Sequence, residues 1–285
     1  MATMSDISER EPIIRVENFT ASYGGRTVLE NVSFEIARGE VFLIAGGSGC
    51  GKSTLLKHMI GLYRPAGGRI LIDGDDIAQA TGAKLLAILR KIGVAYQGGA
   101  LFGSMTTLEN VRLPLEEYTS LPSDAIDIIA LSKLKLVSME HAAQRMPAEL
   151  SGGMKKRAAL ARAIALDPQI VFLDEPSAGL DPISSAELDN LILQLARLLK
   201  TTFVIVSHEL PSIFAIADRA VVLDASVKTM VALGNPSEMR KSSPNAWVRA
   251  FFNRDPSGVH PSAGEPARHS LAADPARPKG DGDES

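Results

Sequence analysis

A glycine-rich loop at residues 46–53 reads G-G-S-G-C-G-K-S and fits the pattern G-x-x-x-x-G-K-[ST]. In loops of this pattern, backbone amides surround phosphate oxygens and the lysine reaches the terminal phosphates. The apolar run at residues 41–45 predicts a buried strand before the loop, and residues 52–61 predict a helix after it. Because a phosphate loop requires a strand on one side and a helix on the other, we expect an α/β domain that binds a nucleotide.

Each residue type in this loop has a physical reason. Glycines remove side chains and permit unusual dihedrals, which lets the backbone approach a ligand closely. The following helix points its positive end at the anion, and we expect the Ser53 hydroxyl to contact Mg²⁺. Cys50 is interpreted as a small, tolerated residue, with redox sensitivity as the alternative. The expected nucleotide-binding residues of the loop are Gly46, Gly47, Ser48, Gly49, Cys50, Gly51, Lys52, Ser53 and Thr54.

Two acidic residues follow a second apolar run, I-V-F-L at residues 170–173. Asp174 is therefore placed at the carboxyl edge of a buried strand, where ligands of open α/β sheets bind. We expect Asp174 to hold Mg²⁺, directly or through water. Glu175 is the candidate to orient or deprotonate an attacking water, because phosphoryl transfer depends mainly on positioning and charge stabilisation. The alternative is that the two acids only cap a helix before Pro176.

A third motif, L-S-G-G-M at residues 150–154, is absent from generic phosphate-loop kinases and GTPases. Ser151 and the amides of Gly152 and Gly153 stand at the start of a helix expected over residues 154–165. A helix start of this kind is a second anion site, by its dipole and its free amides. In isolation, the same residues are also compatible with a plain helix-capping serine followed by two glycines.

Composition excludes several classes of protein. The chain has 285 residues, 45% apolar content and a formal charge of −3, so there is no basic excess for nucleic acid. No apolar run approaches the roughly 18 residues of a spanning helix. The N-terminal residues 1–10 lack the pattern of a secretory signal. The single cysteine excludes an intramolecular disulfide and fits a reducing compartment.

The remaining pattern predicts one nucleotide domain and a polar tail. Apolar runs alternate with helical spacing, which indicates a parallel sheet covered on both faces. Residues 98–147 show helical spacing without β-branched runs and predict an inserted helical subdomain. Residues 238–252 predict one amphipathic helix, packed on the body or on a second copy, and residues 254–285 predict a disordered tail. The other predicted strands lie at residues 13–19, 28–36, 69–72, 92–97, 203–207 and 220–223.

The three motifs, in this order, resemble the ATPase subunit of ABC transporters over residues 13–234. The resemblance implies an α/β phosphate-loop NTPase core of the RecA type, with a parallel sheet, an N-terminal antiparallel β-subdomain and a helical subdomain at about residues 98–158. The domain would span residues 12–253, ending in a helical extension at 236–253. ATP and Mg²⁺ are the implied ligands. A homodimer is also implied, with ATP between Lys52 of one copy and Ser151 of the other.

Lesser motifs gain their roles from the same resemblance. Gln97 corresponds to the glutamine that senses Mg²⁺ and the bound partner, and Asp181 ends the S-A-G-L-D loop that crosses the dimer. His208 follows an apolar strand and resembles the switch histidine that contacts the terminal phosphate. Tyr23 resembles the aromatic that stacks on adenine, which suits its flat ring, although Phe19 is a competing aromatic nearby.

A narrower likeness rests on three segments: Q-G-G-A-L-F at 97–102, N-V-R-L-P-L at 110–115, and K-K-R-A-A after Met154. They are similar to the ATPases of the Mla (Mce-associated) phospholipid transport systems. That likeness implies an integral membrane permease, an MCE-domain lipid-binding protein and a small accessory subunit as partners, at the cytoplasmic face of the inner membrane. Residues 100–115 would meet the permease, but their apolar side chains are equally compatible with subdomain core.

The sequence is also compared with two other functions. An importer of a small polar solute would share every catalytic motif and would need an extracytoplasmic binding protein. A soluble ABC ATPase acting on DNA or ribosomes is disfavoured, because the chain has one nucleotide domain, no long heptad run and a net charge of −3.

Overall fold

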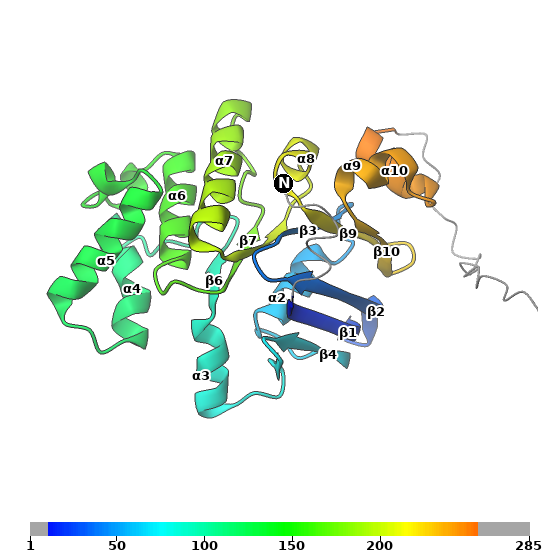
Figure 1. Cartoon of the computed structure of the whole chain (residues 1–285), viewed down its shortest axis with the longest axis horizontal. Coiled ribbons are helices and arrows are strands. Elements are labelled where there is room, and N and C mark those ends of the chain that lie inside the picture. Colours follow the sequence, from blue (N-terminus) through cyan, green and yellow to red (C-terminus); the bar gives the residue numbers. More distant parts are fainter. Residues whose placement is uncertain (1–10, 256–285) are drawn as a thin grey trace, which may run out of the picture.

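The computed structural model describes residues 11–255, so the predictions for residues 1–10 and for the tail beyond residue 255 lie outside it. The centre of the molecule is a six-stranded sheet with the order β10-β9-β3-β8-β7-β6 (Figure 1). All its strands are parallel except β10, which runs antiparallel to β9. The strands are β3 (Val41–Gly46), β6 (Ile92–Ala95), β7 (Ile170–Asp174), β8 (Thr202–Val206), β9 (Arg219–Asp224) and β10 (Thr229–Gly234).

A second, antiparallel sheet comes from the N-terminal part of the chain and confirms the implied β-subdomain. Its strand order is β2-β1-β4-β5. The first two strands form a long hairpin joined at residues 24–25. The strands are β1 (Pro12–Tyr23), β2 (Arg26–Ala37), β4 (Gly67–Ile72) and β5 (Asp75–Asp76).

Every residue of β3 is buried, because the strand has an apolar layer on each face. Phe42 and Ile44 pack with the antiparallel sheet and with α2 (Lys52–Met59). Val41 and Leu43 face the opposite way and pack with the helices that cover the other face. Side chains alternate across a strand, so a strand covered on both sides reads as a continuous apolar run, as residues 41–45 do.

Helices cover both faces of the central sheet. The antiparallel sheet, α2 and α3 (Gly82–Arg90) share one apolar cluster with one face. The other face packs against α6 (Gly152–Ala163), α7 (Pro182–Leu199) and α8 (Leu210–Ile216). This layered arrangement places the loops after β3, β7 and β8 at the same edge of the sheet, where ligands of open α/β sheets bind.

The predicted inserted region is helical, on the left of Figure 1. It contains α4 (Thr107–Tyr118), α5 (Ser123–Leu136) and two short 3₁₀ turns at Glu140–Ala142 and Pro147–Glu149. Asn110 of α4 is fully buried, and its amide nitrogen donates to the carbonyls of Phe102, Met105 and Thr106. Its carbonyl accepts from the Phe102 amide at 2.8 Å, so one side chain holds the loop that precedes the helix.

One prediction about the C-terminal part was wrong, and one strand there was not predicted. Strand β10 was missed, because it is a half-buried edge strand without a clear alternation of apolar residues. The single helix predicted at residues 238–252 is two helices, α9 (Pro236–Ser242) and α10 (Ala246–Asn253). Pro244 interrupts the helical backbone between them. The Asn245 side chain caps α10 by accepting from the Trp247 amide at 2.9 Å.

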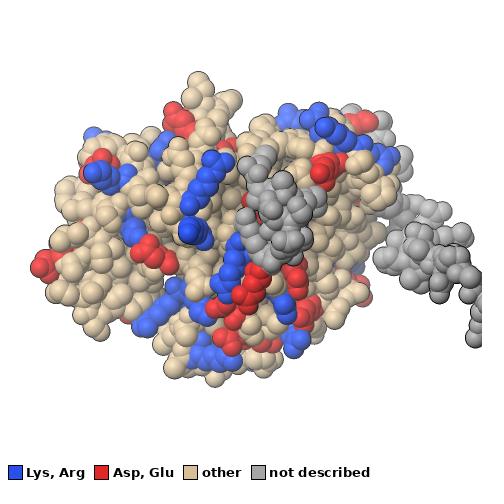
Figure 2. Space-filling view, viewed as in Figure 1, with Lys and Arg blue, Asp and Glu red and all other residues tan. Residues whose placement is uncertain are grey.

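Helix α10 packs on the body of its own chain. Its Phe252 is buried against Phe214 of α8, with ring centroids 5.6 Å apart. Within residues 11–255, none of the helices is both long and apolar enough to cross a membrane. On the face shown in Figure 2, basic and acidic side chains are interspersed rather than separated.

An ionic cluster ties the two sheets together around Asp73. The Asp73 carboxylate, on the turn after β4, accepts from Lys91 next to β6 and from Arg38 between β2 and β3. These two partners, Lys91 first, hold the pKa of Asp73 below its ordinary value. A carboxyl with a depressed pKa stabilises the fold above its unfolded pKa, and this stabilisation disappears as the pH falls through the folded pKa.

We expect Asp73→Asn to lower the free energy of unfolding at pH 7 by on the order of 1 kcal/mol. The difference from the wild type should shrink between about pH 5 and pH 2, as the wild-type carboxyl becomes protonated. Urea unfolding across this range measures it, with Glu30→Gln on an exposed carboxylate as the control. A difference of equal size at both ends of the range would contradict the ionic explanation.

Candidate functional site

The loop between β3 and α2 is shaped by glycines at two positions. Gly46 has φ of 143°, and a Cβ there would lie 2.3 Å from the carbonyl oxygen of Leu223 on the neighbouring strand β9. Gly51 has φ of 102°, and a Cβ there would lie 2.8 Å from Leu29 Cγ. A side chain at either position would push the backbone out of this conformation.

The loop opens onto the start of α2. Gly51 is the N-cap residue, and within the described chain no side chain caps the helix. The first turn of α2 carries no acidic residue. The helix therefore presents uncapped amides and the positive end of its dipole, which suit phosphate oxygens.

Lys52 holds its ammonium over the loop. Its Nζ donates to the carbonyls of Gly46 and Gly47, each at 2.9 Å. The cation and the amides of the loop thus lie at one place, at the carboxyl end of β3.

A cavity of about 500 Å³ opens beside the loop and brings together residues from several separate segments. The loop forms one wall, and Gln97, Glu175 and His208 come from the ends of three other segments. Two wall residues, Val28 and Phe251, were not predicted from the sequence. The lining residues are Val28, Gly46, Gly47, Ser48, Gly49, Gly51, Lys52, Ser53, Thr54, Gln97, Glu175, His208 and Phe251.

The two acids at the end of β7 have buried oxygens without partners. Neither Asp174 Oδ1 nor Glu175 Oε2 has a hydrogen-bond partner among residues 11–255. Burial, followed by the neighbouring charge of Glu175, raises the pKa of Asp174, whereas Lys57 and the Ser53 hydroxyl lower it. Buried oxygens of this kind favour a positively charged ligand beside the phosphate loop.

The donor set fits Mg²⁺ bound together with phosphates rather than a metal site made of protein alone. In the part of the chain that the structure describes, no group of three or more His, Cys, Asp or Glu residues is placed to hold a metal ion. Mg²⁺ is commonly held by one or two protein oxygens together with substrate phosphates and water. Asp174 and Ser53 offer such oxygens, and Gln97 lines the same cavity.

Glu175 and His208 form a pair at the mouth of the cavity. Nδ1 of His208 lies 2.7 Å from Oε1 of Glu175. The Glu175 side chain is 11% exposed and that of His208 is 60% exposed. Glu175 has φ of 49°, in the left-handed region, and its amide donates to the Val206 carbonyl at 2.9 Å. Glu175 is therefore held both through its carboxylate and through its backbone amide.

Several predicted site residues do not line this cavity. Ser151 is the N-cap of α6, and its Oγ accepts from the Met154 amide at 3.3 Å. Gly152 and Gly153 form the first turn of that helix. Asp181 caps α7 by accepting from the Ile183 and Ser184 amides, each at 3.0 Å. The helix start at Ser151 thus has the geometry of an anion site, away from the chain's own phosphate loop.

Tyr23 and Cys50 are also absent from the lining. Tyr23 is 40% exposed and lies in an aromatic cluster, with ring centroids 5.7 Å from Tyr63 and 6.2 Å from His58. The Cys50 thiol is turned into the core and is 1% exposed. Cys50 is therefore available to a ligand only through its backbone.

Phe251 lines the cavity, although the sequence did not predict it there. It lies on α10, stacked on Trp247 with ring centroids 5.6 Å apart. The helical spacing of the two rings predicted an amphipathic helix, but no local pattern indicated that this helix reaches the phosphate-loop cavity.

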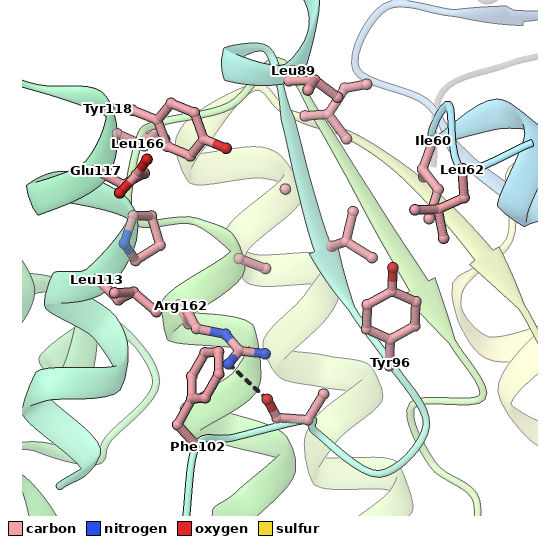
Figure 3. A pocket seen from close by; sticks show the side chains of 16 residues that line it. Ile60, Leu62, Leu89, Tyr96, Phe102, Leu113, Glu117, Tyr118, Arg162 and Leu166 are labelled. Atoms are coloured by element: carbon pink, nitrogen blue, oxygen red, sulfur yellow. Dashed lines mark hydrogen bonds between the residues drawn. The ribbon is translucent and has the colours of Figure 1, made fainter. Parts of the chain in front are cut away.

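A separate apolar groove of about 710 Å³ lies between the central sheet and the helical region (Figure 3). Phe102, Leu113 and Pro114 line it from the segment at residues 100–115, opposite Ile60 and Leu62 at the end of α2. Phe102 is 50% exposed and Leu62 is 56% exposed. The predicted segment therefore contributes exposed apolar side chains here, while Val111 and Leu115 are buried in the core.

Comparison with known proteins identifies relatives over most of the chain. The profile of the ABC transporter family matches residues 29–178. The intermembrane phospholipid transport system ATP-binding protein MlaF of Haemophilus influenzae is 40% identical over 81% of this chain and 86% of that protein. MlaF of Escherichia coli is 39% identical over 85% of this chain and 88% of that protein. The probable ribonucleotide transport ATP-binding protein mkl of Mycobacterium leprae is 42% identical over 84% of this chain and 68% of that protein.

Solved structures show the same architecture and confirm the predicted fold. The chain resembles cbiO1 of Clostridium perfringens, part of the ABC transporter complex cbiONQ, with a TM-score of 0.75 and 30% identity over 86% of this chain and 97% of that one. It also resembles the ATP-binding cassette MJ0796 in a dimeric post-hydrolysis state with ADP and phosphate. That likeness has a TM-score of 0.70 and 30% identity over 78% of this chain and 98% of that one.

We expect the Cys50 thiol to react slowly with a disulfide reagent. Burial raises its pKa, so little thiolate forms near pH 8 in the folded protein. The thiolate is the reactive form of cysteine, and its reaction with a disulfide reagent at pH 8 should be more than about tenfold slower in the folded protein than in denaturant. Equal rates in the folded and unfolded protein would contradict this placement.

Proposed function

The chain belongs to the ABC transporter family, and from that premise we propose that it is the ATP-hydrolysing subunit of a transporter that moves phospholipid between bacterial membranes. The observation that carries the ATPase part is the cavity in which the phosphate loop meets Gln97, Glu175 and His208. The transport part rests on the two MlaF relatives, whose names specify intermembrane phospholipid transport.

ATP would bind with its phosphates against the loop. The amides at the start of α2 and the Lys52 ammonium offset the negative charge of the phosphates. Mg²⁺, when bound, would be held by Ser53, Gln97 and Asp174 and would screen the charge of the phosphate oxygens. Thr54 lines the same wall and offers a hydroxyl to a phosphate oxygen.

Glu175 is placed to act on the attacking water. Its carboxylate reaches the cavity, with Oε1 held by His208 and Oε2 without a partner in the described chain. Oε2 would accept a hydrogen bond from water and orient it toward the terminal phosphorus, or take its proton as the new P–O bond forms and the bond from that phosphorus to the bridging oxygen breaks, with ADP as the leaving group. His208 holds the carboxylate through Oε1 and is itself exposed in the cavity lining, where it would contact the terminal phosphate.

The second anion site would be used by another copy of the chain. Ser151, Gly152 and Gly153 start α6 but do not line the cavity of their own chain. In a head-to-tail homodimer, this helix start would close the cavity of the partner over the ATP phosphates. Asp181, at the start of α7, would meet the same interface, and Tyr23 would stack on the adenine. The dimeric likeness to MJ0796 supports this arrangement.

The apolar groove is the proposed contact with an integral membrane permease. Its wall contains exposed Phe102 and Leu62, and exposed apolar surface of this size suits a partner helix. The permease would hold the chain at the cytoplasmic face of the inner membrane, together with an MCE-domain lipid-binding protein and a small accessory subunit. These partners are proposed from the likeness to the Mla systems.

An importer of a polar solute is the second candidate. It is favoured by the Mycobacterium leprae relative, whose name specifies probable ribonucleotide transport. We prefer phospholipid transport because the chain covers 86% and 88% of the two MlaF proteins but 68% of that relative.

We expect Glu175→Gln to lower ATP turnover at least about a hundredfold while ATP binding remains, because the water loses its general base. Size-exclusion chromatography with MgATP should then show an ATP-dependent dimer. Lys52→Ala is the matched variant, and it should lose nucleotide binding, measured by calorimetry. Unchanged turnover in Glu175→Gln would remove Glu175 from the mechanism, and normal ATP affinity in Lys52→Ala would overturn the phosphate-loop assignment.

We expect Phe102→Asp to weaken association with membranes, because it puts a charge into the apolar groove. Tagged chains are purified from solubilised membranes with MgATP, and co-purifying proteins are identified by mass spectrometry. Ile128→Asp, on exposed α5 outside the groove, is the control. Recovery of the same permease with both variants would contradict the docking site, and a solute-binding protein in place of an MCE-domain protein would favour the importer.

A further inference from the structure

Lys156 of α6 is half-buried between three segments. Its side chain lines a void of only about 10 Å³ with Ala95 of β6, Leu173 of β7 and Pro176. The stem is therefore enclosed by apolar neighbours, and only the ammonium is left to make polar contacts.

The ammonium of Lys156 bonds two backbone carbonyls far apart in the sequence. Its Nζ donates to the carbonyl oxygen of Gln97 and, at 3.1 Å, to that of Glu175. Lys156 lies about one and a half turns after Ser151, on the helix that begins with the second anion site. One side chain thus connects this helix to the Gln97 segment and to the residue proposed to act on water.

Neighbouring carboxylates partly offset the effect of burial on the pKa of Lys156. Burial lowers the pKa of Lys156, while the carboxylates of Glu175, Asp174 and Glu209 raise it. A half-buried ammonium keeps its charge where it is hydrogen-bonded and has acidic neighbours. The bonds to the two carbonyls meet the first requirement, and the acids at the end of β7 and before α8 meet the second.

The Glu175 backbone needs such support. Its φ of 49° lies in the left-handed region, which is unfavourable for a non-glycine residue. Its amide donates to the Val206 carbonyl, and its carbonyl accepts from Lys156 and, at 3.3 Å, from the Ala178 amide. Because the direction of a side chain follows from its backbone, loss of the Lys156 bond would leave the carbonyl with the Ala178 amide alone and would let the carboxylate shift from its direction into the cavity.

Arg162, further along α6, provides a comparison. It donates to the carbonyls of Ala100 at 2.8 Å and Gly99 at 2.9 Å, and it lies in the wall of the apolar groove (Figure 3). Arg162 and Lys156 together hold residues 97–100 against α6. Of these two side chains, only Lys156 also reaches Glu175.

We propose that Lys156 is a positioning residue that connects the helix carrying Ser151 to the backbone of Glu175. Its two hydrogen bonds keep the Glu175 carboxylate directed into the cavity as long as α6 and the Gln97 segment stay in contact. The proposal rests on the proposed ATPase function. It assigns to Lys156 no contact with nucleotide. Its effect is therefore on the chemical step rather than on ATP binding.

The test compares Lys156→Met with the wild-type chain in steady-state ATP hydrolysis. A misplacement of about 1 Å costs up to about a hundredfold, so kcat should fall by about tenfold to a hundredfold while KM for ATP stays within about twofold. Lys156→Arg keeps donors for both carbonyls and should recover most of the loss. Lys155→Met removes the neighbouring charge on the same helix and should keep the wild-type kcat.

A wild-type kcat in Lys156→Met, or a KM that rises in proportion to the loss of kcat, would overturn the proposal. Absence of hydrolysis by the wild-type chain would instead overturn the proposed function. If Lys156→Met does not fold, Lys156→Gln replaces it with the same expected result, because glutamine is too short to reach both carbonyls.

A second readout separates positioning from a general structural role. In the Glu175→Gln background, adding Lys156→Met should leave the ATP-dependent dimer intact, because the side chain that Lys156 positions is already inactive. Loss of that dimer at an unchanged melting temperature would show that Lys156 acts through Ser151 and nucleotide binding, and would overturn the proposal.

Discussion

The parallel pairing of β3, β8 and β7 decides where the reacting groups emerge. Ile44 of β3 and Asp174 of β7 both pair with Val206 of β8, so the three strands end at one level. The loop at Gly46, the carboxylate of Glu175 and the ring of His208 follow within two residues of that level. Side-chain packing on both faces holds this register, because each face fits a different apolar layer and a shift by one residue would mismatch both.

Much of this arrangement follows from the sequence alone. The buried strands are visible as short apolar runs. Polar and charged residues follow these runs, at the carboxyl edge of the sheet where ligands bind. Lys52 could be assigned because the glycines around it specify a local backbone shape. Glu175 was predicted from its place after an apolar strand, and His208 from its resemblance to the switch histidine of the family. Their pairing depends on the strand order, which the sequence does not encode locally.

What escaped prediction depends on contacts between distant segments. The bonds from Lys156 to two carbonyls have no sequence signature, because any residue supplies a carbonyl. The break at Pro244 is an exception, because it is local and was overlooked although proline ends helices. Phe251 reaches the cavity through the packing of α10 on the body, which helical spacing alone does not specify.

We propose that ATP is held at this edge of the central sheet between two copies of the chain. Cryo-electron microscopy of Glu175→Gln with MgATP and its membrane partners tests this proposal. We predict a dimer with ATP phosphates on the Lys52 loop and the terminal phosphate beside residue 175 and His208. The helix start at Ser151 of the partner subunit should complete the site. ATP bound elsewhere, or a dimer whose helix starts face away from the nucleotide, would contradict it.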